Sequence, residues 1–196
     1  MKGGYNALFN CKTRGMAKKK TTLPDKKNNS EAVEVNEDQV IEAAQVTKSI
    51  LDDMGVESYC KTSGSTGLHI YIPLGNKYTN EQSKEFARMI VTLVHNELPD
   101  FTSIERAIKD RKGKMYLDFF QNRPHATIAA AYSVRPKPGA TVSMPLHWDE
   151  VKKGLKISDF HIRNAIERMN SEGDIFKPVL GKGIDLKKAI EKYAGK

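Results

Sequence analysis

The segment of residues 61–73, KTSGSTGLHIYIP, constrains the fold of this chain most, because it joins a polar turn to a short strand. Gly64 and Gly67 allow the turn backbone dihedral angles that other residues rarely adopt. In the strand, His69 and Tyr71 share one face and three aliphatic residues share the other. The segment therefore predicts a strand with one apolar face, entered through a tight polar turn.

The same turn has the composition of an anion site. Successive backbone amides in such a turn can converge on an anion, and the hydroxyl groups of Ser63 and Ser65 add donors. Ser63 lies at the mouth of the turn, and His69 lies at the start of the strand that follows. We therefore expect this turn to bind a phosphate group.

The charge of the whole chain agrees with a polyanionic partner. The 196 residues carry a formal net charge of +8, and the pI is about 9.3. This balance favours nucleic acid over a membrane, because no basic amphipathic helix and no apolar run of transmembrane length are evident. The first residues lack the pattern of a signal peptide, and two cysteines, Cys11 and Cys60, suit a reducing compartment. We expect a cytoplasmic protein; a basic domain without a polyanionic partner is the alternative.

Residues 1–35 differ in composition from the remainder. They contain few aliphatic residues and no hydrophobic period, and their lysines cluster at positions 18, 19, 20, 26 and 27. We expect a disordered basic tail, which is either a solvated run of charge or a weak arm for nucleic acid. A single domain is then expected over residues 36–196.

Aliphatic residues at helical spacing predict four main helices in that domain. They are expected to begin after Asn36, Thr79, Ser158 and Asp185. Asn36 and Thr79 are each followed three residues later by glutamine, which is typical of a helix N-terminus. The third helix is expected to bury Ile162, Ile166 and Met169.

Asp118 is the most informative carboxylate of the chain. Residues 114–120 alternate as a strand, in which Asp118 shares a face with Tyr116 and Phe120. An ionised carboxylate among apolar neighbours is costly unless it is paired or bound to a metal ion. Asp118 is therefore either a metal ligand or a residue at the strand end that reaches solvent.

The segment of residues 121–145 has little periodicity and many polar side chains, among them Arg123 and Arg135. A connection of this length in a compact domain is more often functional than idle. Its arginines could bind phosphate oxygens in a forked geometry.

Several familiar sites are excluded by spacing. No glycine stands two residues before Ser65, as the nucleophile elbow of hydrolases requires, and no lysine follows Gly67, as in a P-loop. The cysteines and histidines do not have a zinc spacing. The remaining groups suit metal-assisted handling of a nucleoside triphosphate.

Three motifs carry a family resemblance: KTSGSTGLHIYIPL, RKGKMYLDFFQNR and AAYSVRPKPGATVSMPLHW occur in this order within roughly residues 37–185. They resemble the polymerase domain of bacterial ligase D, which belongs to the archaeo-eukaryotic primase-polymerase superfamily and acts in non-homologous end joining. The resemblance implies an α/β (α+β) palm with a mostly antiparallel sheet flanked by helices. It also implies a DNA-repair nucleotidyltransferase that adds nucleotides, often ribonucleotides, to DNA ends with Mn²⁺ or Mg²⁺. The implied partners are DNA ends, ATP or another nucleoside triphosphate, Ku and a ligase domain, in a nucleoid-associated setting.

The resemblance assigns roles residue by residue. Asp118 and His69 are implied to be catalytic, and Asp118 is implied to bind the metal ion. Nucleotide contacts are implied for Lys61, Ser63, Gly64, Ser65, Gly67, His69 and Arg135. DNA contacts are implied for Arg111 and Arg123.

The chain departs from the family in its first motif. Relatives have an Asp-any-Asp pair on the strand before the helix that begins here near Asp38, whereas this chain reads DKKNNSEAVEVNED, with Asn28 and Ser30 about where the aspartates should lie. Two-metal transfer needs carboxylates for both ions, so polymerisation is expected to be impaired. The family's amino-terminal portion is also largely absent, and the loss of a central strand would expose a sheet edge. A non-catalytic nucleotide- or DNA-binding module and a gene-fragment remnant are the alternatives.

Overall fold

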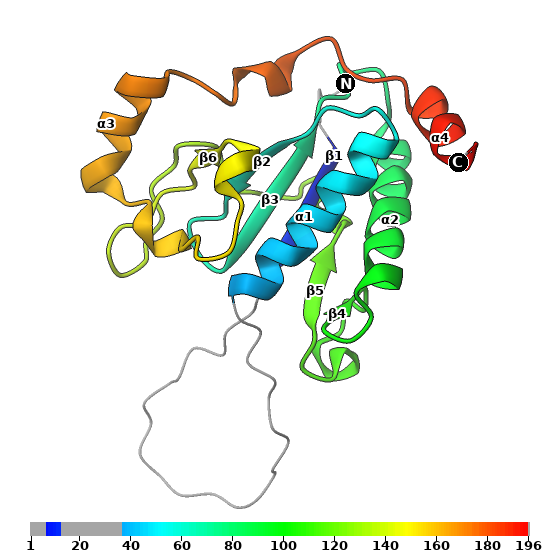
Figure 1. Ribbon diagram of the computed structural model, residues 1–196, viewed down its shortest axis with the longest axis horizontal. Coiled ribbons are helices and arrows are strands. Elements are labelled where there is room, and N and C mark those ends of the chain that lie inside the picture. Colours follow the sequence, from blue (N-terminus) through cyan, green and yellow to red (C-terminus); the bar gives the residue numbers. More distant parts are fainter. Residues whose placement is uncertain (1–6, 13–36, 196) are drawn as a thin grey trace, which may run out of the picture.

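The structure is a computed structural model that describes residues 7–12 and 37–195. In these ranges a single sheet has the strand order β4-β5-β1-β3-β2-β6 (Figure 1). The strands are β1 (Ala7–Lys12), β2 (Tyr59–Thr62), β3 (Gly67–Ile72), β4 (Thr102–Ser103), β5 (Met115–Asp118) and β6 (Pro145–Leu146). The β4–β5 pair is parallel and the other pairs are antiparallel, which confirms the mostly antiparallel sheet expected from the sequence.

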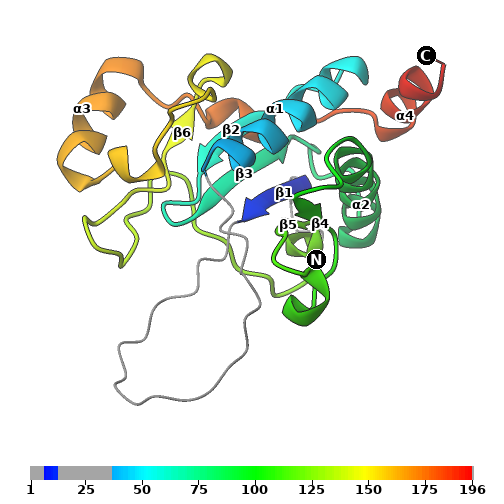
Figure 2. The ribbon, with the colours of Figure 1, turned by 60° about the horizontal axis from the view of Figure 1, so that its bottom comes forward.

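Helices α1 (Glu37–Asp53) and α2 (Asn80–Glu97) lie along one side of the sheet (Figure 2). The sequence predicts both, and at Thr79 the expected capping box is present, because its side chain accepts from the Gln82 amide while the Gln82 side chain accepts from the Thr79 amide. Buried aliphatic side chains of both helices pack with those of β3 and β5 into the main core. In the described ranges, no helix is long and apolar enough to cross a membrane.

The alternation of β3 gives the sheet a second, polar side. Leu68, Ile70 and Ile72 belong to the core under the helices. Successive side chains of a strand point to opposite faces, so His69 and Tyr71 lie on the face away from that core. The alternation expected from the sequence is thereby confirmed, and the polar face carries the candidate site.

Strand β1 corrects the expected tail for six residues. Ala7–Lys12 pair with β3 on one edge and residues 10–12 pair with β5 on the other, so β1 occupies a central position in the sheet. The sheet therefore keeps the central strand whose loss was expected. No local period signals β1, because partners far along the chain fix it on both edges. The remaining residues of the expected tail, with Asn28 and Ser30, lie outside the described residues.

The later helices also differ in part from expectation. Helix α3 (Ile162–Glu172) begins after His161 rather than after Ser158, and it buries Ala165. Ile162, Ile166 and Met169, which were expected to be buried, are 49%, 65% and 41% exposed. Their spacing predicted an apolar helix face correctly, but spacing does not reveal whether another element covers that face.

The C-terminal part of the chain crosses the end of the sheet. From α3 it runs past the end of β3 to α4 (Leu186–Ala194), which lies beside α2 (Figure 1). Phe176 meets the Tyr71 ring edge-on at 5.0 Å, and the Ile184 amide donates to the Pro73 carbonyl at 3.0 Å. Short 3₁₀ helices join the main elements: η1 (Ile108–Arg111), η2 (Phe120–Asn122), η3 (Trp148–Glu150), η4 (Ile157–Asp159) and η5 (Lys177–Leu180).

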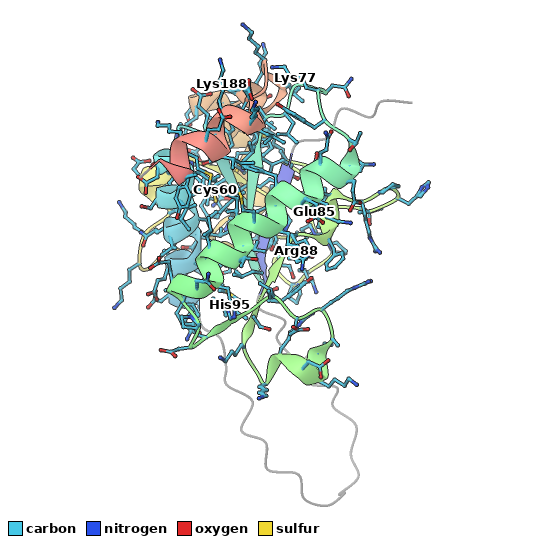
Figure 3. The ribbon with its side chains drawn as sticks, turned by 90° about the vertical axis from the view of Figure 1, so that its right-hand side faces the viewer. Cys60, Lys77, Glu85, Arg88, His95 and Lys188 are labelled. Carbon is cyan, nitrogen blue, oxygen red and sulfur yellow. The ribbon has the colours of Figure 1, made fainter. Side chains whose placement is uncertain are left out.

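Helix α2 shields the core from solvent on its own side. Figure 3 shows Glu85 and Arg88 on its outer surface. Cys60 is fully buried, whereas Glu85 and Arg88 form an exposed ion pair at 3.9 Å. His95, in the last helical turn, lies 2.8 Å from the Thr102 hydroxyl and ties α2 to β4. These residues serve the fold, and the candidate site lies on the opposite face.

Candidate functional site

The turn between β2 and β3 closes around one hydroxyl group. The backbone amides of Ser65, Thr66 and Gly67 each donate to Ser63 Oγ at 3.1 Å, and the Ser63 amide donates to the Gly67 carbonyl at 2.8 Å. The amides thus converge on Ser63 rather than outward. A hydroxyl that accepts hydrogen bonds keeps its own proton as a donor. The three amide bonds polarise the Ser63 O–H and make it a stronger donor to an anion.

A buried lysine orients the histidine. Lys61 is fully buried, and its Nζ lies 2.9 Å from His69 Nδ1 and donates to Ser143 Oγ at 2.5 Å. An ammonium group has donors and no acceptor, so His69 Nδ1 accepts and the neutral imidazole carries its hydrogen on Nε2. Lys61 is a positioning residue in this geometry, because it turns a histidine N–H into a defined donor.

Arg135 lies against the same turn. A Cβ atom built on Gly64 would lie 2.5 Å from Arg135 Cγ, and Thr141 Oγ1 donates to the Gly64 carbonyl at 2.6 Å. The Arg135 Nε–H is buried and has no hydrogen-bond partner among the described residues. Buried donors are nearly always paired, so this N–H is a donor for which the described residues supply no acceptor.

Asp118 lies on the same face of the sheet as His69. Both are Cα partners of Asn10, Asp118 from β5 and His69 from β3, and Lys61 of β2 pairs with His69. Residues directly opposite each other in antiparallel strands share a face. Since neighbouring strands lie about 4.8 Å apart, the Cα atoms of Asp118 and His69 are separated by about 10 Å across β1.

The carboxylate of Asp118 is buried and already hydrogen bonded. Its residue is 6% exposed, so the alternative that it reaches solvent is wrong. Oδ1 accepts from the Phe120 amide at 2.9 Å, and Oδ2 accepts from Gln121 Nε2 at 3.1 Å. Both carboxylate oxygens therefore already have a donor within the chain.

Tyr116 connects Asp118 to a cluster of arginines. Burial raises the pKa of Tyr116, and the negative charge of Asp118 raises it further. The guanidinium of Arg111 lies over the Tyr116 ring at 4.0 Å, and it donates to the carbonyls of Glu105 and Arg106. Arg111 is thus held at the β5 side of the site, whereas Arg123 is exposed at the end of η2.

The structure adds two residues that sequence reasoning missed. Ser143 links Lys61 to the Thr62 carbonyl, and Thr141 holds the turn at Gly64. Both come from a stretch, TVSM, in which polar and apolar residues alternate, and all four residues are buried. That alternation was the available signal. Its partner, the strand edge at Thr62, lies some 80 residues earlier.

Comparisons with known proteins agree with the three motifs. The family model "LigD, primase-polymerase domain" matches residues 32–176. The bifunctional non-homologous end joining protein LigD of Bacillus subtilis is 37% identical over 134 residues, which are 68% of this chain and 22% of that protein. The multifunctional LigD of Pseudomonas aeruginosa is 30% identical over 132 residues, 67% of this chain and 16% of that protein. The chain thus spans about a fifth of the length of these relatives, and β1 lies outside the family match.

A solved structure shares the fold. The polymerase domain from Mycobacterium tuberculosis ligase D, in complex with DNA, aligns with a TM-score of 0.74 and 22% sequence identity. The alignment covers 91% of this chain and 56% of that chain. The palm-like sheet with flanking helices is therefore the architecture of that domain.

Proposed function

Since this chain belongs to the family of LigD primase-polymerase domains, we propose that it binds a nucleoside triphosphate and acts at DNA ends in non-homologous end joining. Two observations carry the proposal: Arg135 lies against the turn that closes on Ser63, and His69 and Asp118 lie in one row of the same sheet face. A hydroxyl, an imidazole N–H and a guanidinium are the donors that a polyphosphate requires.

DNA and protein partners follow from charge and family. The net charge of +8 supports a polyanionic partner, and the similar domain from M. tuberculosis is in complex with DNA. We assign DNA contacts to Arg111, beside the site, and to the exposed Arg123. Ku, a ligase domain and a nucleoid-associated cytoplasmic location belong to the same proposal.

The polymerase step is the part of the family activity that we expect to be impaired here. Two-metal transfer uses Mn²⁺ or Mg²⁺ ions held by several carboxylates. The row of paired residues across β5, β1, β3 and β2 that contains His69 and Lys61 has one carboxylate, Asp118. Primer extension on gapped DNA with Mn²⁺ tests this. We expect little or no extension, and robust extension that Asp118→Ala abolishes would contradict the impairment.

Nucleotide binding tests the pocket itself. ATP titrated in the presence of Mn²⁺ should bind the wild type, and both His69→Ala and Arg135→Ala should weaken binding by about tenfold, the loss of one charge-assisted hydrogen bond each. Arg123→Ala is the matched control, which should weaken DNA binding and leave ATP affinity unchanged. Unchanged ATP affinity in both pocket variants would remove the proposed site.

A further inference from the structure

We infer that the candidate site binds the triphosphate through protein cations, without a divalent metal ion between the phosphates and the protein. The inference rests on the proposed nucleotide binding and changes its expected dependence on Mn²⁺ or Mg²⁺.

The donor set does not fit a pair of metal ions. Hard divalent cations need several oxygen ligands, mostly carboxylates. Among the residues whose side chains the structure describes, no group of three or more His, Cys, Asp or Glu could hold a metal ion. Asp118 is the carboxylate in the row, and each of its oxygens already accepts a hydrogen bond, from Phe120 and Gln121.

Strand β1 does not supply the missing carboxylates. Its Asn10 is the Cα partner of both Asp118 and His69, and its Lys12 is the partner of both Tyr116 and Gly67. These two register positions flank Asp118 and the anion turn, and they hold an amide and an ammonium residue. The chain has no Asp or Glu before Asp25, so no neighbouring residue of β1 changes this.

Protein cations replace that charge. Lys61 is fully buried and contacts His69, and the Arg135 side chain packs against Gly64 with a buried Nε–H that has no hydrogen-bond partner among the described residues. The site therefore has two basic side chains and one carboxylate. Without an intervening metal ion Asp118 repels a triphosphate, whereas with one it would hold the ligand. The two arrangements predict opposite effects of removing its charge.

The test is calorimetric titration of ATP into the whole chain, once with EDTA and once with excess Mn²⁺, for the wild type and for Asp118→Asn. We expect the wild type to bind ATP in EDTA at least as tightly as with Mn²⁺. We expect Asp118→Asn to bind ATP about threefold or more tightly than the wild type with excess Mn²⁺ as well as in EDTA, because repulsion is relieved in both conditions. The Asn oxygen can still accept from the Phe120 amide, and a melting curve checks the fold.

The outcomes separate the two proposals. If Mn²⁺ tightens wild-type binding by more than about twofold, or if Asp118→Asn weakens binding with Mn²⁺, the metal-free arrangement is overturned while nucleotide binding stands. If ATP binds in neither condition, the proposed function fails, and the inference fails with it. If Asp118→Asn does not fold, the comparison of EDTA with Mn²⁺ on the wild type decides alone.

A reciprocal variant tests the part assigned to β1. Asn10→Asp combined with Lys12→Asp places two carboxylates at the register positions beside Asp118 and Gly67. The double variant should bind ATP about tenfold more tightly with Mn²⁺ than with EDTA, since three carboxylates can then share the metal ion. Equal affinity in the two conditions would contradict the assignment of the missing ligands to β1.

Discussion

Gly64→Ala, compared with a control glycine, should show how much the packing of Arg135 against the anion turn contributes beyond the cost of the positive φ angle. Gly64 has a φ angle of +63°, in the left-handed region that residues with a Cβ atom rarely adopt. An added Cβ would lie 2.5 Å from Arg135 Cγ and 3.0 Å from backbone atoms of Val142 and Ser143. The side chain of Arg135 would have to leave the turn, because the backbone on the other side is fixed by Thr62.

The size of the effect follows from these two costs. The left-handed conformation costs about 1–2 kcal/mol for a residue with a Cβ atom, and overpacking of a filled site adds about 1–3 kcal/mol. Gly139→Ala is the matched control, because Gly139 also has a positive φ of +84° but no atom within 4 Å of its added Cβ. We expect Gly64→Ala to lower the free energy of unfolding by about 2–5 kcal/mol, and Gly139→Ala to lower it by about 1–2 kcal/mol.

Urea unfolding and ATP titration measure the two consequences. Gly64→Ala should also weaken ATP binding by at least tenfold, about 1.4 kcal/mol, because Arg135 is displaced, whereas Gly139→Ala should leave the affinity unchanged. Equal losses of stability in the two variants would refute the close packing of Arg135 on the turn. Full ATP affinity in a folded Gly64→Ala would refute the role of that packing in binding.

Three further predictions concern single side chains. Ser63→Ala removes the acceptor of three backbone amides and should lower the free energy of unfolding by about 2 kcal/mol. Ser65→Ala in the same turn should change it by under about 0.5 kcal/mol. Urea unfolding curves that coincide for the two variants would contradict this. Lys61→Met should change the free energy of unfolding by no more than about 1 kcal/mol, because a buried basic side chain is replaced by an apolar one of similar shape. It should weaken ATP binding about tenfold. A thermal melt and an ATP titration check the two effects, and intact ATP affinity would argue against the positioning role of Lys61. Burial and the hydrogen bond to Asp174 raise the pKa of Tyr132 to about 12. The wild type should therefore lose stability relative to Tyr132→Phe as the pH rises from about 10, the pKa in the unfolded chain, through 12. Parallel curves of unfolding free energy against pH over that range would disprove the contribution.

Much of the fold follows from local signals in the sequence. The capping box at Thr79, the alternation around His69 and the alternation around Asp118 each specify an element within a few residues. These signals are local because hydrogen bonds of a helix cap and faces of a strand involve near neighbours. The polar turn was recognised for the same reason, from its glycines and hydroxyl residues.

The remainder depends on pairings that no local pattern carries. The expected anion turn directs its amides at Ser63, which required the closed turn geometry to be seen. Ser143 reaches Lys61 across 82 positions of the chain, and β1 is fixed by partners on two other strands. The exposed apolar face of α3 was misassigned as core, since amphipathic spacing defines a face without naming what covers it.

The chemistry of the site depends on the register of β1. Asn10 joins Asp118 to His69 in one row, and a shift of β1 by a single residue would move Cys11 onto this face instead. Because β3 and β5 hold the turn, the histidine and the aspartate in place, β1 can vary without disturbing the anion-binding groups. On the proposal above, the residues at positions 10 and 12 would set the metal response of the site, while Ser63, His69 and Arg135 would set its affinity for phosphate.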